Sequence, residues 1–237
     1  MKLSIVFPAY NEEKRIIPVL KKYYSFFSEK FKKEFELIII PNNCNDKTFE
    51  VVKDFSRNKK NIVIKNISYY IGKGGAVMKG FKLAKGDLIG FVDSDESTSP
   101  KEFFKLYFNI KNYEGIIGSR RMKKSKIIPK RKFSKRLNSL GFNLTVRILF
   151  NFKYKDTQCG AKIFKKKIAR YLEKNFTETG WIFDVDLLNL CKKKRYKIKE
   201  FPITWKDSED SKLTHLDGFK ELFRVIRYSF VSKNPKH

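Results

Sequence analysis

The sequence predicts an α/β fold, with a doubly wound, mostly parallel sheet and helices on both faces. Short apolar runs that end at proline or an acidic residue alternate with longer segments whose apolar residues recur every three or four positions. The short runs are typical of buried strands, and the longer segments of amphipathic helices. Regular alternation of the two favours βαβ units, which build parallel sheets.

The first half of the chain follows this alternation closely. Within the first expected helix, Ile16, Val19, Leu20 and Tyr23 have the spacing that places them on one helical face. The strands are expected at residues 3–7, 36–40, 62–67, 87–92 and 115–118, and the helices between them at residues 12–33, 46–58 and 74–84.

The alternation stops after the fifth strand. The basic segment 120–136 is interpreted as a mobile loop, and residues 137–152 as a helix that is apolar over much of its circumference. Near the carboxyl terminus, residues 219–230 have the pattern of a basic amphipathic helix. Without an internal repeat or a linker, we expect one main domain at residues 1–213 and a basic amphipathic tail at 214–237.

The composition points to an anionic partner. The chain has 237 residues, of which 41% are hydrophobic, enough for one full-sized core. Lysine and arginine total 53 against 25 acidic residues, which gives a net charge of +28. Nucleic acid, anionic lipid headgroups and phosphorylated substrates all suit such a charge. A compositional bias of the genome explains part of it equally well.

Cysteine usage and hydropathy indicate the compartment. Cys44, Cys159 and Cys191 are far apart and form no CxxC pair, so neither a disulfide framework nor a zinc site is indicated. The amino terminus reaches proline and acidic residues before a secretory apolar segment forms. No run of about 18 apolar residues occurs. We expect a cytoplasmic protein that contacts the cytoplasmic face of a membrane peripherally.

Three strand ends carry the polar residues of interest. Ligands of doubly wound sheets bind beyond the carboxyl ends of the strands, so we expect residues 8–13, 42–46 and 93–96 to converge in one cleft. Asp93 and Asp95 follow the fourth strand directly, where a divalent cation would offset the repulsion between their carboxylates. Mg²⁺ or Mn²⁺ held there could also bind a substrate diphosphate. The alternative is an ordinary surface turn in which an aspartate caps the next helix.

A glycine-rich segment precedes the third helix. At residues 72–75, glycines allow backbone amides and the helix amino terminus to approach a phosphate, with Gly74 as a donor and Lys73 as a counter-charge. The spacing matches neither a Walker loop nor a dinucleotide fingerprint. A plain turn between strand and helix explains the glycines nearly as well.

Several ordered motifs together are more specific than any one of them. FPAYNEE after the first strand, DSD after a later one and GSRR after the next resemble the family 2 glycosyltransferases, which have the GT-A fold. GKGGAVMKG, DTQCGAKIF and FDVDLL narrow the resemblance to polyprenol-phosphate sugar synthases of the dolichyl-phosphate glucose and dolichyl-phosphate mannose synthase type. The resemblance covers residues 2–213.

By this resemblance, the donor nucleotide lies across the first strand ends. Pro8, Tyr10 and Glu12 are implied to surround the base and ribose, whereas the alternative is that Pro8 and Tyr10 only shape a turn. Asn42 stands where the family usually has an acid that reads a ring N–H of the base, and Asp46 matches the later acid of that motif. Asn42 thus leaves the base unassigned.

The resemblance also assigns the metal and the acceptor phosphate. Asp93 and Asp95 match the acidic triplet that binds the metal and diphosphate, and Ser97 falls where the mannose enzymes carry a further polar residue. Arg120 and Arg131 match the basic region that holds the lipid phosphate, a task suited to the forked guanidinium. For Arg131, a solvated cation in a basic loop is an equal alternative.

Two later motifs complete the implied site. Asp156 and Gln158 are expected close to the sugar or the metal, and Cys159 is expected to pack rather than to act as a nucleophile. Asp184 and Asp186 lie in an apolar helical segment. One reading has one of them facing the cleft; the alternatives for either are capping or surface exposure.

The implied activity is inverting, metal-dependent transfer of a hexose from a nucleotide diphosphate sugar to dolichyl or polyprenyl phosphate. Glucose from UDP-glucose is favoured, with mannose from GDP-mannose next. An anionic membrane surface, or a membrane partner protein, would bring the enzyme to its acceptor. One alternative is a soluble glycosyltransferase acting on protein or polysaccharide. Another is a nucleic-acid-binding protein, although the basic residues are spread out and no RNA-binding signature occurs.

Overall fold

The computed structural model describes residues 1–129, 133–180, 182–207 and 215–233. Its centre is a seven-stranded sheet of order β3-β2-β1-β4-β7-β5-β8, and a separate two-stranded ribbon pairs β6 with β9. The strands are β1 (Leu3–Ala9), β2 (Phe35–Pro41), β3 (Ile62–Ile64), β4 (Leu88–Val92), β5 (Gly115–Ser119), β6 (Lys126–Ile128), β7 (Ala161–Lys165), β8 (Ile198–Pro202) and β9 (Thr204–Lys206). The helices are α1 (Ile16–Phe31), α2 (Thr48–Ser56), α3 (Gly72–Leu83), α4 (Pro100–Asn109), α5 (Phe133–Phe150), α6 (Lys166–Asn175), α7 (Phe183–Lys193) and α8 (His215–Lys233).

The predicted α/β class is confirmed, and each expected strand and helix of the first half is present. Strand β1 pairs in parallel with β2 on one side and with β4 on the other, as βαβ units require. The sequence reading did not anticipate β7, which lies between β4 and β5 and runs antiparallel to both. The sheet is therefore mixed, and β7 joins its two parallel parts.

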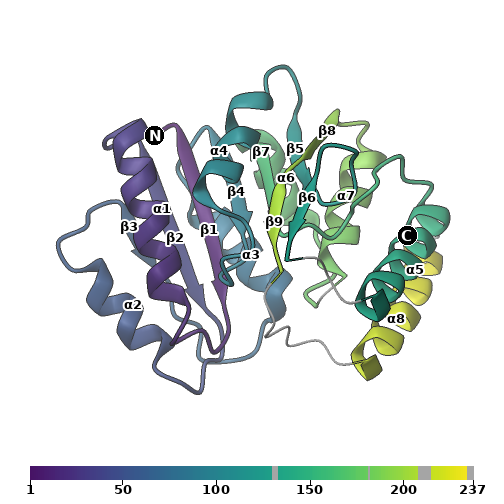
Figure 1. Ribbon diagram of the computed structural model, residues 1–237, viewed down its shortest axis with the longest axis horizontal. Coiled ribbons are helices and arrows are strands. Elements are labelled where there is room, and N and C mark those ends of the chain that lie inside the picture. Colours follow the sequence, from purple (N-terminus) through teal and green to yellow (C-terminus); the bar gives the residue numbers. More distant parts are fainter. Residues whose placement is uncertain (130–132, 181, 208–214, 234–237) are drawn as a thin grey trace.

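Helices cover both faces of the sheet (Figure 1). One face packs against α1, α2 and α4, where Tyr23, Phe27 and Phe103 are fully or almost fully buried among the strand residues. The second hydrophobic cluster contains residues of α3, α5, α6, α7 and α8, and of these helices α3 and α6 contact the strands of the other face. Along β1 the split follows the strand period, because Ile5 and Phe7 face the first layer and Val6 the second.

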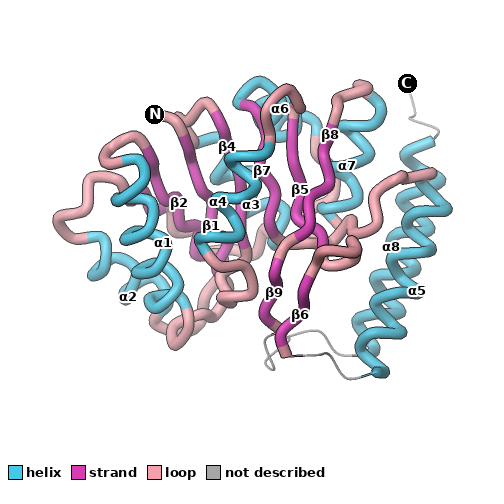
Figure 2. The backbone as a smooth tube through the Cα atoms, turned by 45° about the horizontal axis from the view of Figure 1, so that its top comes forward, coloured by secondary structure: helices cyan, strands magenta, loops and turns pink. Residues whose placement is uncertain are grey.

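The interpretation of residues 120–136 as a loop was wrong for part of that segment. Residues 126–128 form β6, which pairs in parallel with β9, and the Lys126 N–H donates to the Ile203 carbonyl at 3.1 Å. Figure 2 shows the β6–β9 ribbon extending beyond β5 and β8. The partner strand β9 follows about 80 positions later in the chain, and local composition does not reveal such a non-local pairing.

The two carboxyl-side helices α5 and α8 lie side by side at one end of the molecule in both ribbon views. Val146 and Phe150 of α5 and Val225 and Tyr228 of α8 enter the core. The predicted domain boundary at residues 213 and 214 falls outside the described residues. Among those residues, no helix combines the length and apolar character needed to cross a bilayer.

Candidate active site

The loops that follow β1, β2 and β4 meet at one edge of the sheet, as the sequence predicted. The Asn42 N–H donates to the Ala9 carbonyl at 2.9 Å, and the Ser94 hydroxyl donates to the Pro8 carbonyl at 2.7 Å. Each loop also holds one non-glycine residue at positive φ, namely Asn11 (52°), Asn43 (53°) and Glu96 (66°). Such backbone conformations persist where the surroundings enforce them, and they cluster at functional sites.

Asp93 and Lys73 form an ion pair at the centre of this edge. The Lys73 Nζ lies 2.6 Å from the Asp93 Oδ1, and both side chains are largely buried, at 19% and 25% exposure. Burial raises the pKa of Asp93, and the Asp95 carboxylate adds to that effect, while the Lys73 ammonium opposes it. Burial would lower the pKa of Lys73, but the charges of Asp93 and Asp184 raise it overall. Lys73 thus keeps its positive charge beside the acidic triplet.

Asp95 is held by the loop that follows it. Its Oδ1 accepts the Ser97 N–H at 3.0 Å, and the Ser97 carbonyl accepts the Lys206 N–H at 2.8 Å from β9. No cluster of three or more histidine, cysteine or acidic side chains suited to a metal occurs among the described residues. Two carboxylates fit a Mg²⁺ or Mn²⁺ ion that takes its remaining ligands from substrate phosphates and water.

Asp156 and Arg120 make a second, fork-shaped ion pair. The Arg120 Nε and Nη2 donate to Asp156 Oδ2 and Oδ1 at 2.7 and 2.9 Å, and the Arg120 backbone N–H adds a third bond at 2.9 Å. Burial alone would raise the pKa of the fully buried Asp156, but the guanidinium lowers it to about 2. The guanidinium also lies 5.2 Å from the centre of the Trp205 ring. Arg120, which was predicted to bind the acceptor phosphate, is thus held in place by Asp156, which was predicted to lie near the sugar.

The rest of the DTQCGAK motif lies beside Asp93. The Asp93 N–H donates to the Gly160 carbonyl at 3.1 Å, and a Cβ at Gly160 would sit only 1.9 Å from the Asp93 Oδ2. Cys159 is fully buried in the core, and burial raises its pKa to about 12, which confirms it as a packing residue. The Gln158 N–H donates to Asp156 at 3.3 Å, so the backbone ties these residues together.

The acids near the first two strand ends organise the backbone. Asp46 accepts the Thr48 N–H at 3.0 Å, which satisfies the first turn of α2, and its other oxygen accepts the Glu13 N–H at 3.1 Å. Glu12 binds the Arg15 guanidinium at 2.8 and 2.9 Å. Tyr10 is 42% exposed at the same edge. Contact of Tyr10, Glu12 or Asp46 with a nucleotide stays a prediction.

Asn42 has a clear structural task. Its side-chain amide donates to the Gly72 carbonyl at 3.2 Å and accepts the Ile71 N–H at 3.0 Å, and the residue is 3% exposed. An aspartate could not donate the first of these bonds. The departure from the family's usual acid therefore has a local reason, since the amide fixes the chain just before α3.

The glycines of α3 allow close packing. Gly72 has φ of +69°, and a Cβ there would lie 2.3 Å from the Thr179 carbonyl oxygen. A Cβ at Gly74 would lie 2.5 Å from the Phe183 Cβ, and the Gly74 N–H donates to the Thr179 oxygen at 2.8 Å. The Gly74 amide is thus already engaged within the chain, and its predicted contact with a phosphate stays untested.

Sequence reasoning missed a buried lysine. Lys162 is 0% exposed in β7, and its ammonium donates to the Cys159 carbonyl at 2.7 Å and to the Asp184 carboxylate. Both Asp184 and Asp186 are buried, so surface exposure was the wrong alternative for either. A lysine inside the apolar stretch GAKIF was the available signal, because a buried cation requires a partner.

A pocket of about 350 Å³ opens next to the acidic triplet. Residues 96–100, part of α1 and part of the β6–β9 ribbon line it. Glu96 pairs across it with Lys22 of α1 and lies 3.4 Å from Lys206 of β9. The loop that carries Asp95 therefore borders open space on the α1 side.

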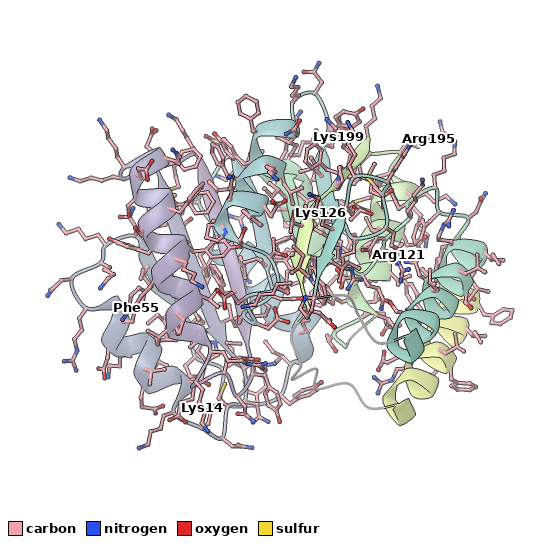
Figure 3. All side chains as sticks on the ribbon, in the orientation of Figure 1. Lys14, Phe55, Arg121, Lys126, Arg195 and Lys199 are labelled. Atoms are coloured by element: carbon pink, nitrogen blue, oxygen red, sulfur yellow. The ribbon has the colours of Figure 1, made fainter. Side chains whose placement is uncertain are left out.

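The remaining cations are dispersed. Figure 3 shows Lys14 at the lower left and Arg195 and Lys199 at the upper right, while Arg121 and Lys126 lie nearer the middle. Arg121 binds the carbonyl and hydroxyl of Ser139 in α5 at 2.7 and 2.8 Å. Arg131 lies outside the described residues, so its predicted role stays a prediction.

Comparisons with known proteins identify the family. The model of the family "Glycosyl transferase family 2" matches residues 4–172. The dolichyl-phosphate beta-glucosyltransferase of Dictyostelium discoideum is 34% identical over 96% of this chain and 74% of its own length. The protein of the same name from Saccharomyces cerevisiae is 35% identical over 89% of this chain and 69% of its own length.

Solved structures show the same fold. Glucosyl-3-phosphoglycerate synthase from Mycobacterium tuberculosis, crystallised with Mn²⁺, UDP and phosphoglyceric acid, superposes with a TM-score of 0.69 at 15% identity, covering 98% of this chain and 78% of that one. S. aureus TarS 1-349 in complex with UDP-GlcNAc superposes with a TM-score of 0.63 at 21% identity, covering 100% and 68%. With a family model that spans more than half of its residues, the chain belongs to the family 2 glycosyltransferases.

Proposed function

We propose that this glycosyltransferase moves glucose from UDP-glucose to a dolichyl or polyprenyl phosphate. The observation that carries the proposal is the pair Asp93 and Asp95 at the end of β4, in a chain 34% identical to a dolichyl-phosphate beta-glucosyltransferase over most of both lengths. Mannose from GDP-mannose is the competing donor.

The donor end of the site consists of acidic residues and one fixed cation. Asp95 and Asp93 would hold Mg²⁺ or Mn²⁺ together with the donor diphosphate, and the ion would neutralise charge on the departing nucleotide. Lys73 lies 2.6 Å from Asp93 and supplies a positive charge at the same place. Tyr10 and Pro8 lie at the neighbouring strand end, where we place the base and ribose.

The acceptor needs no strong general base. A lipid phosphate is anionic near neutral pH, so its oxygen can attack the anomeric carbon while the bond from that carbon to the diphosphate oxygen breaks and UDP departs with the electron pair. Attack in line inverts an α-linked donor to a β-linked product. Positioning and electrostatic stabilisation then supply most of the rate. We place the acceptor phosphate near Arg120, whose guanidinium is already held in orientation by Asp156.

An outward surface on α5 and α8 fits a membrane. We define the α5–α8 apolar surface as Leu140, Leu144, Ile148, Phe223, Ile226, Phe230 and Val231, all exposed. Phe223 and Phe230 are 70% and 67% exposed, and Arg227 lies one turn from each on the same side of α8. Apolar side chains interspersed with cations gain from burial in an interface that carries anionic lipids. We propose that this surface brings the enzyme to its lipid acceptor.

The first test measures transfer of radiolabelled sugar from UDP-glucose and from GDP-mannose to a short polyprenyl phosphate, with Mg²⁺ or Mn²⁺. We expect a lipid-extractable product from UDP-glucose, and a loss of about 10³-fold or more in Asp95→Ala, because oriented charge at a phosphoryl leaving group supplies several kcal/mol. Asp87→Ala, at the opposite end of β4 and exposed, is the matched control and should retain activity.

Each alternative donor or acceptor corresponds to a distinct result of this test. Product from GDP-mannose alone would replace glucose by mannose. Transfer to a soluble protein or polysaccharide without lipid would show that the acceptor is not a lipid phosphate. Absence of turnover with any nucleotide sugar, together with salt-sensitive RNA binding, would overturn the proposal.

A further inference from the structure

Asp186 is a buried carboxylate that the proposed chemistry does not use. It is 1% exposed in α7, and its Oδ2 accepts the backbone N–H groups of Thr177 and Glu178 at 2.7 and 3.0 Å. The Thr177 hydroxyl adds a bond at 3.2 Å, and the Tyr228 hydroxyl of α8 donates to the Oδ1. One carboxylate thus joins the segment 177–180 to the carboxyl-terminal helix.

The segment 177–180 in turn supports the beginning of α3. The Thr179 carbonyl accepts the Gly74 N–H at 2.8 Å, and its oxygen occupies the space where a side chain at Gly72 would stand. Lys73, between these glycines, extends to Asp93. A displacement of the segment would therefore shift the backbone that aims the Lys73 ammonium at the acidic triplet.

Helix α8 contacts the same segment with a second side chain. A Cβ at Gly180 would lie 3.4 Å from the Arg224 Nη1, and Arg224 also pairs with Glu221 at 2.8 Å. Tyr228 is 8% exposed in the core, whereas Phe223 and Phe230 on the same helix are outward. Burial and the Asp186 charge both raise the pKa of Tyr228, so its hydroxyl stays a hydrogen-bond donor at neutral pH. One face of α8 thus packs in the core, and the other face is exposed.

We propose that Tyr228 is a positioning residue of the donor site, through which α8 and Asp186 hold the segment 177–180 against α3 and keep Lys73 aimed at Asp93. This rests on the proposed use of Lys73 and Asp93 in donor binding. Any influence of α8 on donor affinity is reciprocal, so donor binding also favours the docked position of α8. The helix that carries the proposed membrane surface is then linked to nucleotide affinity.

The test removes one hydroxyl group and keeps the ring. In Tyr228→Phe, we expect the affinity for UDP with Mn²⁺, measured by titration calorimetry, to fall about 5-fold. One net hydrogen bond to a charged group is lost, and local packing still holds part of the segment in place. The KM for UDP-glucose should rise by a similar factor, while kcat at saturating donor and the KM for the lipid acceptor stay within about twofold. Tyr113→Phe, on an exposed residue near the amino end of β5, is the control.

A second measurement needs no ligand. Amide hydrogen exchange at residues 177–180 and at Gly74 should be faster in Tyr228→Phe than in the wild type, by a larger factor than exchange in β1. Unchanged exchange at Gly74 would overturn the proposal whatever the UDP affinity, and so would an unchanged UDP affinity in a variant whose exchange had risen. A wild-type protein that binds no UDP would instead contradict the proposed function, and exchange at Gly74 would still decide whether α8 supports α3.

Discussion

Helices α1 and α8 both bury one stripe in the core, but their outer faces differ. The outer face of α1 exposes Lys21, Lys22 and Glu29, as expected of a helix that faces water. The outer face of α8 exposes Phe223, Ile226 and Phe230, and α5 beside it exposes Leu144 and Ile148. Core packing explains the inner stripes of both helices. It does not explain why one end of a chain with 53 basic residues presents aromatic side chains to its surroundings.

The same contrast divides the proposed tasks. Loops after β1, β2 and β4 hold the polar groups that we assign to the donor, and the helices around them are conventional. The half that begins at β5 supplies the support for those groups and the α5–α8 apolar surface. In the proposed function, one half of the sheet would bind the donor, and the other half would complete the site and contact the lipid.

The largest expected effect comes from Asp156, where the later half supports the site. Asp156→Asn leaves the Arg120 guanidinium buried without its anion, and should lower the free energy of unfolding at pH 7 by about 3 kcal/mol. The folded-state pKa, at about 2, lies below the ordinary value, so the carboxylate stabilises above about pH 4 and its contribution disappears as the pH falls toward 2.

Urea titrations of wild type and Asp156→Asn from pH 7 to pH 2 measure this difference. It should shrink on acidification, and each protein should unfold in one transition. Two separate transitions would show that the halves are independent units, and that the later half does not support the donor loops.

Gly160→Ala tests the contact between β7 and the acidic triplet. A Cβ there would lie 1.9 Å from the Asp93 Oδ2, so the carboxylate must move. We expect kcat/KM for UDP-glucose to fall about 100-fold, because a displacement of about 1 Å at an active site lowers the rate by about this factor. A folded variant of normal activity would show that the position of Asp93 does not matter to turnover.

Phe230→Ser tests the outer face of α8. We expect its affinity for sedimented vesicles of anionic phospholipid to fall about 10-fold or more, because a phenyl ring that enters an interface contributes roughly 1.5–3 kcal/mol. Transfer to a short, water-soluble prenyl phosphate should not change. Lys21→Ser on α1 is the matched control, and an equal loss of vesicle binding there would attribute the association to net charge alone.

Gly141→Ala should have the smallest effect. Apart from the backbone of α5 itself, no atom of the described residues lies within 4 Å of where its Cβ would stand. The substitution should therefore stabilise the protein by about 0.5–1 kcal/mol in thermal unfolding, through helix propensity. Lower vesicle affinity in this variant would show that the surface of α5 at this position approaches the lipid closely.

The sequence was sufficient for the features that depend on local pattern. The strands up to β5 and the helices α1 to α3 follow from hydrophobic periodicity, whereas α4 was not predicted. The convergence of the strands' carboxyl ends follows from topology. The fork between Arg120 and Asp156 was not predictable, because the motifs named both residues without indicating that they would bind each other. Nothing in the local sequence around residue 126 indicated its partner at residue 204.

Asn42 and Gly74 show a second limit. The sequence made both of them candidates for binding the nucleotide sugar, whereas the Asn42 side chain bonds to residues 71–72 and the Gly74 N–H bonds to residue 179 of the same chain. A residue type that suits ligand binding also suits backbone support, and only coordinates separate the two uses. Lys162 was the opposite case. A lysine inside an apolar strand indicates a buried cation that requires a partner, and an analysis of hydrophobic periodicity alone overlooks it.

The antiparallel strand β7 has a consequence for biosynthesis. Asp93 leaves the ribosome well before Gly160, whose carbonyl accepts its N–H, and β4 lacks its β7 neighbour until residues 161–165 have emerged. The acidic triplet therefore cannot reach its final shape in a nascent chain that ends before β7, however complete β1 to β4 are. Since non-local pairings form late, the site is among the last parts of the sheet to be assembled.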